Sequence, residues 1–153
     1  MTSEVCPLLP TRVHVKALTL FIDQPPGLVD LSTAKKLRDA TFVCTAGPQW
    51  ITATLQTITR NHRNFQQLSI GAHNIFNSPD LASIKNRIGG DDYLAWLELD
   101  RFLAQLHESR SVRLNVLFRK NEEKVRCCAK WLLPEVMTRG ILGLEQSRVV
   151  VGA

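Results

Sequence analysis

The sequence predicts an α/β fold in which short parallel strands form one layer and the connecting helices form the other. Three observations support this prediction. A short strand pattern recurs along the chain, the segments between its copies have helical spacing, and alternate residues within the strands are polar. Strands that are covered on both faces usually read as continuous apolar runs, so one polar face indicates helices on one side only.

The repeated unit fits the strand pattern of leucine-rich repeats, L-x-x-L-x-L-x-x-N. Its copies are "VKALTLFID", "LRDATFVCT", "FQQLSIGAH" and, more loosely, "SVRLNVLFR", which begin at Val15, Leu37, Phe65 and Ser111. "TRGILGLEQ", from Thr138, is a weaker fifth copy. The intervals are 22, 28, 46 and 27 residues, and three of them fall within the roughly 20–29 residues of such repeats. The sequence therefore predicts a leucine-rich-repeat-like short solenoid.

The first two connecting segments differ in length. "PPGLVDLSTAKK" is too short for more than one helical turn. "GPQWITATLQTI" predicts a helix with Pro48 at its first position, where the missing N–H costs nothing. Ile51, Leu55 and Ile58 follow at the spacing of one helical face.

The 46-residue interval predicts one repeat with an enlarged outer layer of two helices. In "SPDLASIKNRIGG", Ser78 is the expected N-cap, Pro79 the first helical residue, and the glycine pair at 89–90 the stop. In the following long helix, Asp91 is the expected cap and Asp100 is expected on the surface beside Arg101. The apolar stripe of this long helix consists of Trp96, Leu99, Leu103 and Leu106.

A last helix is predicted in "NEEKVRCCAKWLLPEV", with Asn121 as N-cap and acidic residues in its first turn. Pro134 should end or kink it near Leu133. The expected buried stripe comprises Val125, Cys128, Ala129, Leu132, Leu133 and Val136.

Length and composition indicate one globular domain. The chain has 153 residues, of which 44% are hydrophobic and 22% charged. The repeat domain is expected over residues 13–145, after a disordered N-terminal segment at 1–12 and before a C-terminal tail at 146–153. The net charge is +5, and its densest basic run lies between Arg113 and Lys130. A solvated strand-to-helix connection explains this run better than a nucleic-acid interface, which would want a stronger stripe with aromatic residues beside it.

The cysteines indicate an intracellular protein, cytoplasmic or nuclear, with reduced and mostly buried thiols. Cys6, Cys44 and the adjacent pair Cys127 and Cys128 have neither the spacing of a zinc site nor the density of a secreted disulfide scaffold. The N-terminus lacks the basic start and apolar run of a signal peptide. No stretch approaches the ~20 apolar residues of a membrane span.

The polar residues do not assemble a nucleophile, a base and an orienting group, so no catalytic residue, cofactor or metal site is predicted. His62 is expected in a solvated turn, with a phosphate-binding loop as the alternative. His73 is expected to cap a turn, and His107 diverges from the adjacent Glu108 on a helix. The tryptophans at 50, 96 and 131 lie on helical patterns typical of packing residues.

Four segments carry a family resemblance: "LRDATFVC", "WITATLQTITRNHRNFQQLSI", "WLELDRFLAQLHESRSVR" and "LLPEVMTRGILGLE". They resemble the C-terminal half of a large family of uncharacterised proteins of mushroom-forming fungi, which are similar to F-box proteins with degenerate leucine-rich repeats. The resemblance covers about residues 12–146 and implies a repeat domain that recognises a protein target. In full-length members an F-box would dock a ubiquitin-ligase linker protein. Only about a dozen residues precede the first strand here, so that partner is expected only if an F-box lies upstream.

The expected function is therefore a non-enzymatic protein-interaction module. Two alternatives stay open: a truncated structural remnant without a dedicated partner, and a weak nucleic-acid binder that uses the basic run at 113–130. Partner contacts are expected from the outward slots of the strands, where an aromatic residue among polar ones is typical of a hot spot. These candidate residues are Thr19, Phe21, Asp39, Thr41, Gln67, Ser69, Arg113 and Asn115.

Overall fold

Five strands form a single all-parallel sheet in a computed structural model of the chain, which describes residues 16–21, 30–44, 47–58, 61–76 and 80–146. The strands lie side by side in sequence order, so the predicted parallel pairing is confirmed, and the fifth segment also forms a parallel strand. They are β1 (Ala17–Phe21), β2 (Asp39–Cys44), β3 (Gln67–Ala72), β4 (Arg113–Phe118) and β5 (Leu142–Gln146).

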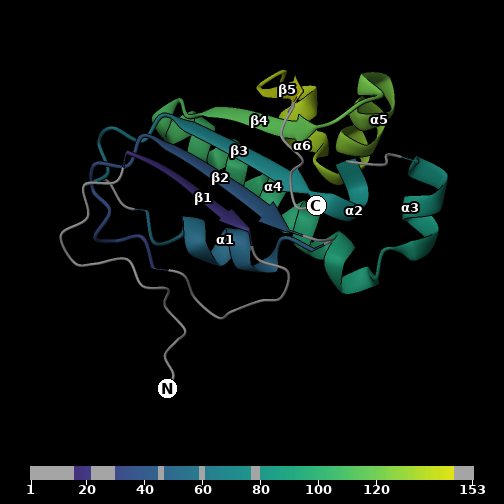
Figure 1. Ribbon diagram of the computed structural model, residues 1–153, viewed down its shortest axis with the longest axis horizontal. Coiled ribbons are helices and arrows are strands. Elements are labelled where there is room, and N and C mark those ends of the chain that lie inside the picture. The colour runs from purple at the N-terminus through teal and green to yellow at the C-terminus, as the bar shows by residue number, and fades with distance from the viewer. Residues whose placement is uncertain (1–15, 22–29, 45–46, 59–60, 77–79, 147–153) are drawn as a thin grey trace.

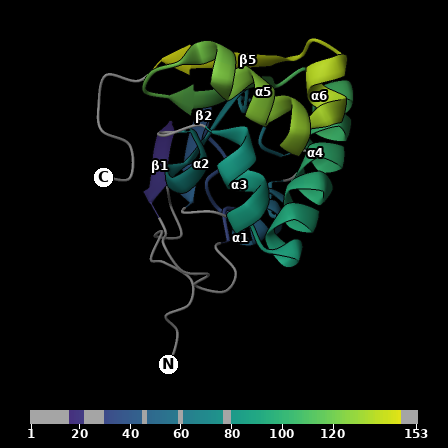
Figure 2. The same cartoon turned by 90° about the vertical axis from the view of Figure 1, so that its right-hand side faces the viewer.

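The helices lie in the connections between β2 and β5 and gather on one side of the sheet. Figure 1 shows the strands in front of the longest helix, and Figure 2 shows the helical layer beside the sheet. The mixed α/β character is thereby confirmed. The helices are α1 (Gln49–Leu55), α2 (His73–Phe76), α3 (Leu81–Arg87), α4 (Gly90–Arg110), α5 (Glu122–Leu132) and α6 (Pro134–Thr138).

The apolar residues of the repeated pattern line up across the sheet because all strand pairs are in register. Leu18, Ala40, Leu68, Leu114 and Leu142 form one such row. Side chains alternate between the two faces of a strand, so the same pattern that fills this row leaves the intervening polar slots on the opposite face. Of the five, Ala40, Leu68 and Leu114 are at most 1% exposed.

Aromatic contacts join the sheet to the helices. Phe42 of β2 meets Trp50 of α1 edge-on, with ring centroids 5.6 Å apart, and Phe76 meets Trp96 of α4 at 5.9 Å. Trp50 and Trp96 are buried core residues, as expected from their helical spacing. Trp131 is half-buried and stacks on Tyr93 of α4. These ring contacts thus join β2 to α1, α2 to α4, and α4 to α5.

The long helix α4 packs through the predicted stripe. Trp96, Leu99 and Leu103 are fully buried, and Leu106 is partly buried against the core. The expected cap was wrong by two residues, because Gly89 is the N-cap and Asp91 lies in the first turn. In the first turn, the negative charge of Asp91 still interacts favourably with the positive end of the helix dipole. Ser111 ends the helix in the left-handed conformation, with φ 56°.

Two further helix ends show how local signals shift in the folded chain. Asp80, rather than Ser78, is the N-cap of α3; Ser78 and Pro79 lie outside the described residues. Asn121 is the N-cap of α5 as predicted, but it is left-handed (φ 63°) and its side chain makes no capping hydrogen bond. Pro134 begins α6 directly after α5 has ended, as expected of a proline. The whole predicted stripe of α5 and α6 is buried.

The remaining boundaries are close to those expected. Helix α1 begins at Gln49, one residue after Pro48. The described part of the first connection, residues 30–38, consists of turns without a helix. Strand β5 includes Gln146, so the expected tail begins one residue later. The segments expected to be a disordered start and a tail lie outside the described residues, as does Cys6.

Candidate functional site

The predicted contact residues meet on the face of the sheet opposite the helices. Thr19, Thr41, Ser69 and Asn115 occupy one row across four strands, and Gly143 of β5 continues it. The outward slots at the start of the strands form a second row. Its members are Asp39, Gln67 and Arg113. The structure thus brings these residues together as the sequence predicts; we call the two rows the polar face.

Accessibility differs across the polar face. Thr19 and Arg113 are exposed, whereas Thr41 and Asn115 are half-buried. Ser69 is only 4% exposed, so its hydroxyl offers a partner little surface. Phe21 pairs with Val43 in the next row, but its side chain lies outside what the structure describes.

The side chain of Asn115 lies over the neighbouring strand. A Cβ placed at Gly143 would come within 2.6 Å of the Asn115 Oδ1. The glycine therefore gives the amide room to lie across β5. This close approach places a hydrogen-bonding group of the polar face beside the edge strand β5.

A separate surface lies at the end of the sheet where the strands begin, the end at the left of Figure 1. It is a hollow of about 640 Å³, which we call the basic hollow. Its lining includes five cationic side chains, and no described carboxylate lines it. The lining residues are Lys16, Lys36, Arg38, Arg63, Asn64, Phe65, Gln66 and Arg110.

Sequence reasoning missed the basic hollow because its residues come from four separate segments. A signal was nevertheless present in the repeat. Lys16, Arg38 and Gln66 stand two positions before the first core-facing residue of β1, β2 and β3. Because side chains alternate along a strand, these three residues lie on the helix side of the sheet, two residues before the first core residue of each strand.

His62 corrects another prediction, since it is a buried residue and not part of a solvated turn. The side chain is 0% exposed, and its Nε2 donates to the carbonyl oxygen of Leu31 over 2.8 Å. The backbone N–H of Leu31 donates in turn to the hydroxyl of Thr57, also over 2.8 Å. The guanidinium of Arg110 donates to the His62 carbonyl. A buried histidine thus joins the loop before β2, the loop before β3 and the end of α4.

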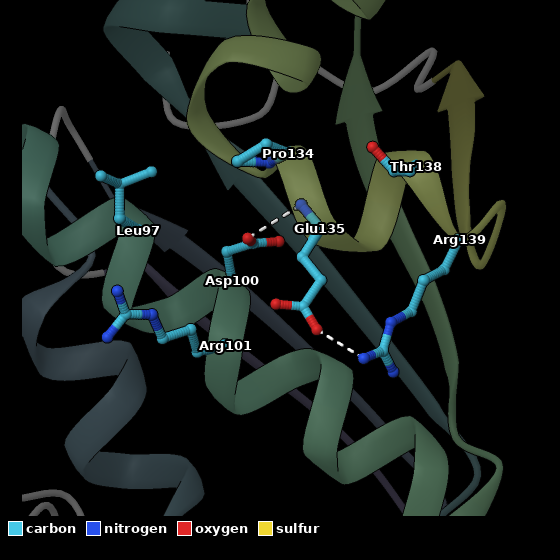
Figure 3. A pocket seen from close by; sticks show the side chains of 7 residues that line it. All are labelled: Leu97, Asp100, Arg101, Pro134, Glu135, Thr138 and Arg139. Carbon is cyan, nitrogen blue, oxygen red and sulfur yellow. Dashed lines mark hydrogen bonds and ion pairs between the residues drawn. The ribbon is translucent and has the colours of Figure 1, made fainter.

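Asp100 was expected on the surface and is instead 3% exposed. Figure 3 shows its carboxylate pointing at the start of α6. It accepts backbone hydrogen bonds from Glu135 (2.9 Å) and Val136 (3.0 Å). Because Leu133, the N-cap residue of α6, makes no capping hydrogen bond, Asp100 caps this helix from α4. Burial raises the pKa of Asp100, and the two backbone donors oppose that shift.

A hollow of about 560 Å³ adjoins Asp100 between α4 and α6. Its other charged residues include Arg139, which forms ion pairs with Glu135 (2.6 Å) and Glu108 (3.4 Å). Both Asp100 oxygens accept hydrogen bonds from the backbone of α6. We therefore assign this hollow to helix packing and not to ligand binding.

The described cysteines follow the expectation of mostly buried thiols. Cys44 and Cys128 are buried, and burial raises their pKa values to about 12 and about 11. Cys127 is exposed. Within the described ranges, no cluster of three or more metal-ligating side chains occurs and no helix is long and apolar enough to cross a membrane.

The basic run at 113–130 does not form one stripe. Arg113 begins β4 and Arg119 follows its last residue, so the strand separates them by roughly 20 Å. Arg126 pairs with Glu122 at 2.9 Å on α5. The cations of the basic hollow are more concentrated, and they come from other parts of the chain.

Comparison of the chain with protein-family models, with curated proteins and with solved structures gives no match.

Proposed function

We propose that this protein is a non-enzymatic, leucine-rich-repeat-like interaction module, and that the polar face is its contact surface for a partner protein. One observation carries the proposal: Thr19, Thr41, Ser69 and Asn115 stand in register on four parallel strands. Repeat proteins use such extended strand surfaces to bind partners.

The chemistry of the polar face favours a polypeptide partner with hydrogen-bonding side chains. The row of Thr19, Thr41, Ser69 and Asn115, which we call the central row, offers hydroxyl and amide groups. The second row places Asp39 and Arg113 on either side of Gln67. Charges of both signs around a neutral centre support orientation-specific docking, because a partner in the reversed position would place like charges together. The ubiquitin-ligase connection implied by the family resemblance is proposed only for a chain that carries an F-box.

The test uses substitutions that place a bulky cation on the polar face. T41R and N115R should abolish retention of a partner from an extract of the source organism, because both side chains stand in the central row. Q105R is the matched control, since Gln105 is an exposed residue of α4 in the helical layer. Circular dichroism should show that all three variants are folded.

The retained partner is then purified and its footprint mapped by hydrogen exchange. We expect protection in β2, β3 and β4. Binding that survives T41R and N115R, or protection confined to the helical layer, would contradict the proposal. A failure of the wild-type chain to retain any partner would favour the structural-remnant alternative.

A further inference from the structure

The geometry points to a second recognition element: we propose that the basic hollow binds an acidic peptide segment through its carboxylates. This inference rests on the proposed function, because its ligand is a stretch of a partner protein. The basic hollow lies at the start of the strands that carry the polar face. Arg38 of the hollow directly precedes Asp39 of that face, so the two surfaces adjoin at the start of β2.

The charge of the hollow is strongly one-sided. Lys16, Lys36, Arg38 and Arg63 are exposed cations on its lining, and Arg110 adds a fifth that is half-buried. The guanidinium groups of Arg38 and Arg63 offer planar pairs of N–H donors, which match carboxylate oxygens in a bidentate manner. Their mutual repulsion is relieved when an anion enters, so an acidic segment gains electrostatic energy that a neutral one does not.

The floor of the hollow is organised before any ligand arrives. The guanidinium of Arg110 lies 6.0 Å from the centre of the Phe65 ring and donates to the His62 carbonyl. The Nε2 of His62 is hydrogen-bonded to the carbonyl oxygen of Leu31, which lies in the loop leading to Lys36 and Arg38. Cationic side chains thus project from segments that a buried hydrogen-bond network holds together. Such preorganisation lowers the ordering cost of binding.

The choice of a peptide over nucleic acid follows from the aromatic content of the hollow. Single-stranded nucleic acids bind to basic grooves with aromatic rings on which their bases stack. The aromatic residue of this lining is Phe65, which is 3% exposed and has Arg110 over its ring. Bases would therefore find charge but no stacking surface. The volume of about 640 Å³ is within the range of roughly 300–1,000 Å³ for ligand pockets, which suits a few side chains of a peptide.

The experiment measures fluorescence anisotropy of a labelled peptide of alternating Glu and Ser. The same peptide with Gln in place of Glu is the ligand control. R38E/R63E reverses two charges in the hollow and should weaken binding at least about tenfold, the equivalent of two lost charge-assisted contacts of ~0.7 kcal/mol each. K124E/K130E makes the same change in net charge on the exposed side of α5 and should leave the affinity within about twofold.

The remaining outcomes overturn the inference. Equal weakening in both double variants would show attraction to net charge alone. Tighter binding of a single-stranded oligonucleotide than of the acidic peptide would assign the hollow to nucleic acid. Displacement of the peptide by equimolar inorganic phosphate would assign it to phosphate groups. Absence of peptide binding by the wild-type chain, with T41R-sensitive partner retention intact, would refute this inference and leave the proposed function standing.

Discussion

Replacement of Asp100 by alanine should destabilise the protein more than the replacement of a surface residue, although the sequence indicates a surface position for Asp100. The carboxylate accepts hydrogen bonds from the backbone N–H groups of Glu135 and Val136. D100A removes both acceptors at once. A buried donor left without a partner costs about 1–3 kcal/mol, but relief of the buried charge offsets part of the loss. We therefore expect the free energy of unfolding to fall by about 2–3 kcal/mol.

Urea unfolding followed by circular dichroism measures this loss, which corresponds to a drop in Tm of roughly 4–12 °C for a domain of this size. D100N is the matched variant, because its single carbonyl oxygen can replace only one of the two acceptors. It should lie between the wild type and D100A. R101A, at the exposed neighbouring position, should change stability by no more than about 0.5 kcal/mol. A D100A protein as stable as R101A would refute the assignment of Asp100 as the cap of α6.

The raised pKa of Asp100 means that the folded state holds this proton more tightly than the unfolded state. The stability that this proton adds to the wild type relative to D100N is therefore fully present below pH 3.8, the ordinary pKa of an aspartate, and declines as pH rises through the folded-state pKa. Urea unfolding of both proteins across acidic pH measures this difference in stability. A stability advantage of the wild type that grows with pH would contradict the raised pKa. L103A removes a fully buried side chain and should cost roughly 2–5 kcal/mol in urea unfolding. L94A on the same helix, at a site that is 62% exposed, should cost far less, and equal costs would refute the packing of α4 described here. In a C6S background, a chromogenic disulfide reagent should react with one thiol in a rapid phase. C127S should abolish this rapid phase, because the thiols of Cys44 and Cys128 are buried. A rapid phase that survives C127S would contradict the burial of these two thiols.

The strands and the helical layer were predictable because their signals are local. The spacing of Leu18 and Leu20, or of Leu68 and Ile70, is enough to indicate a strand with one apolar face. Register then follows, since a slip by one residue would turn the apolar set of a strand away from the core. The same local information predicted that the polar slots would share a face.

Asp100, His62 and the basic hollow were not predictable in this way. Asp100 stands beside an arginine and reads as a surface residue, yet its partners lie 35 and 36 residues away in α6. His62 stands among polar residues, yet it bonds to Leu31 across 31 residues of chain. In each case a tertiary contact supplies the hydrogen bond that water would otherwise provide, and only the fold determines which polar groups gain such a partner.

Helix α4 has a consequence for how the molecule comes apart. In the part of the chain that the structure describes, each strand pairs only with its neighbours in sequence, an arrangement that alone would allow the chain to unfold one unit at a time. Helix α4, however, contacts α1, which follows β2, and α5 and α6, which follow β4. It therefore links the unit after β2 to the unit after β4, because the loss of either one removes part of the packing of α4. A chain pulled from both ends should therefore resist until α4 is released and then give way in a single step.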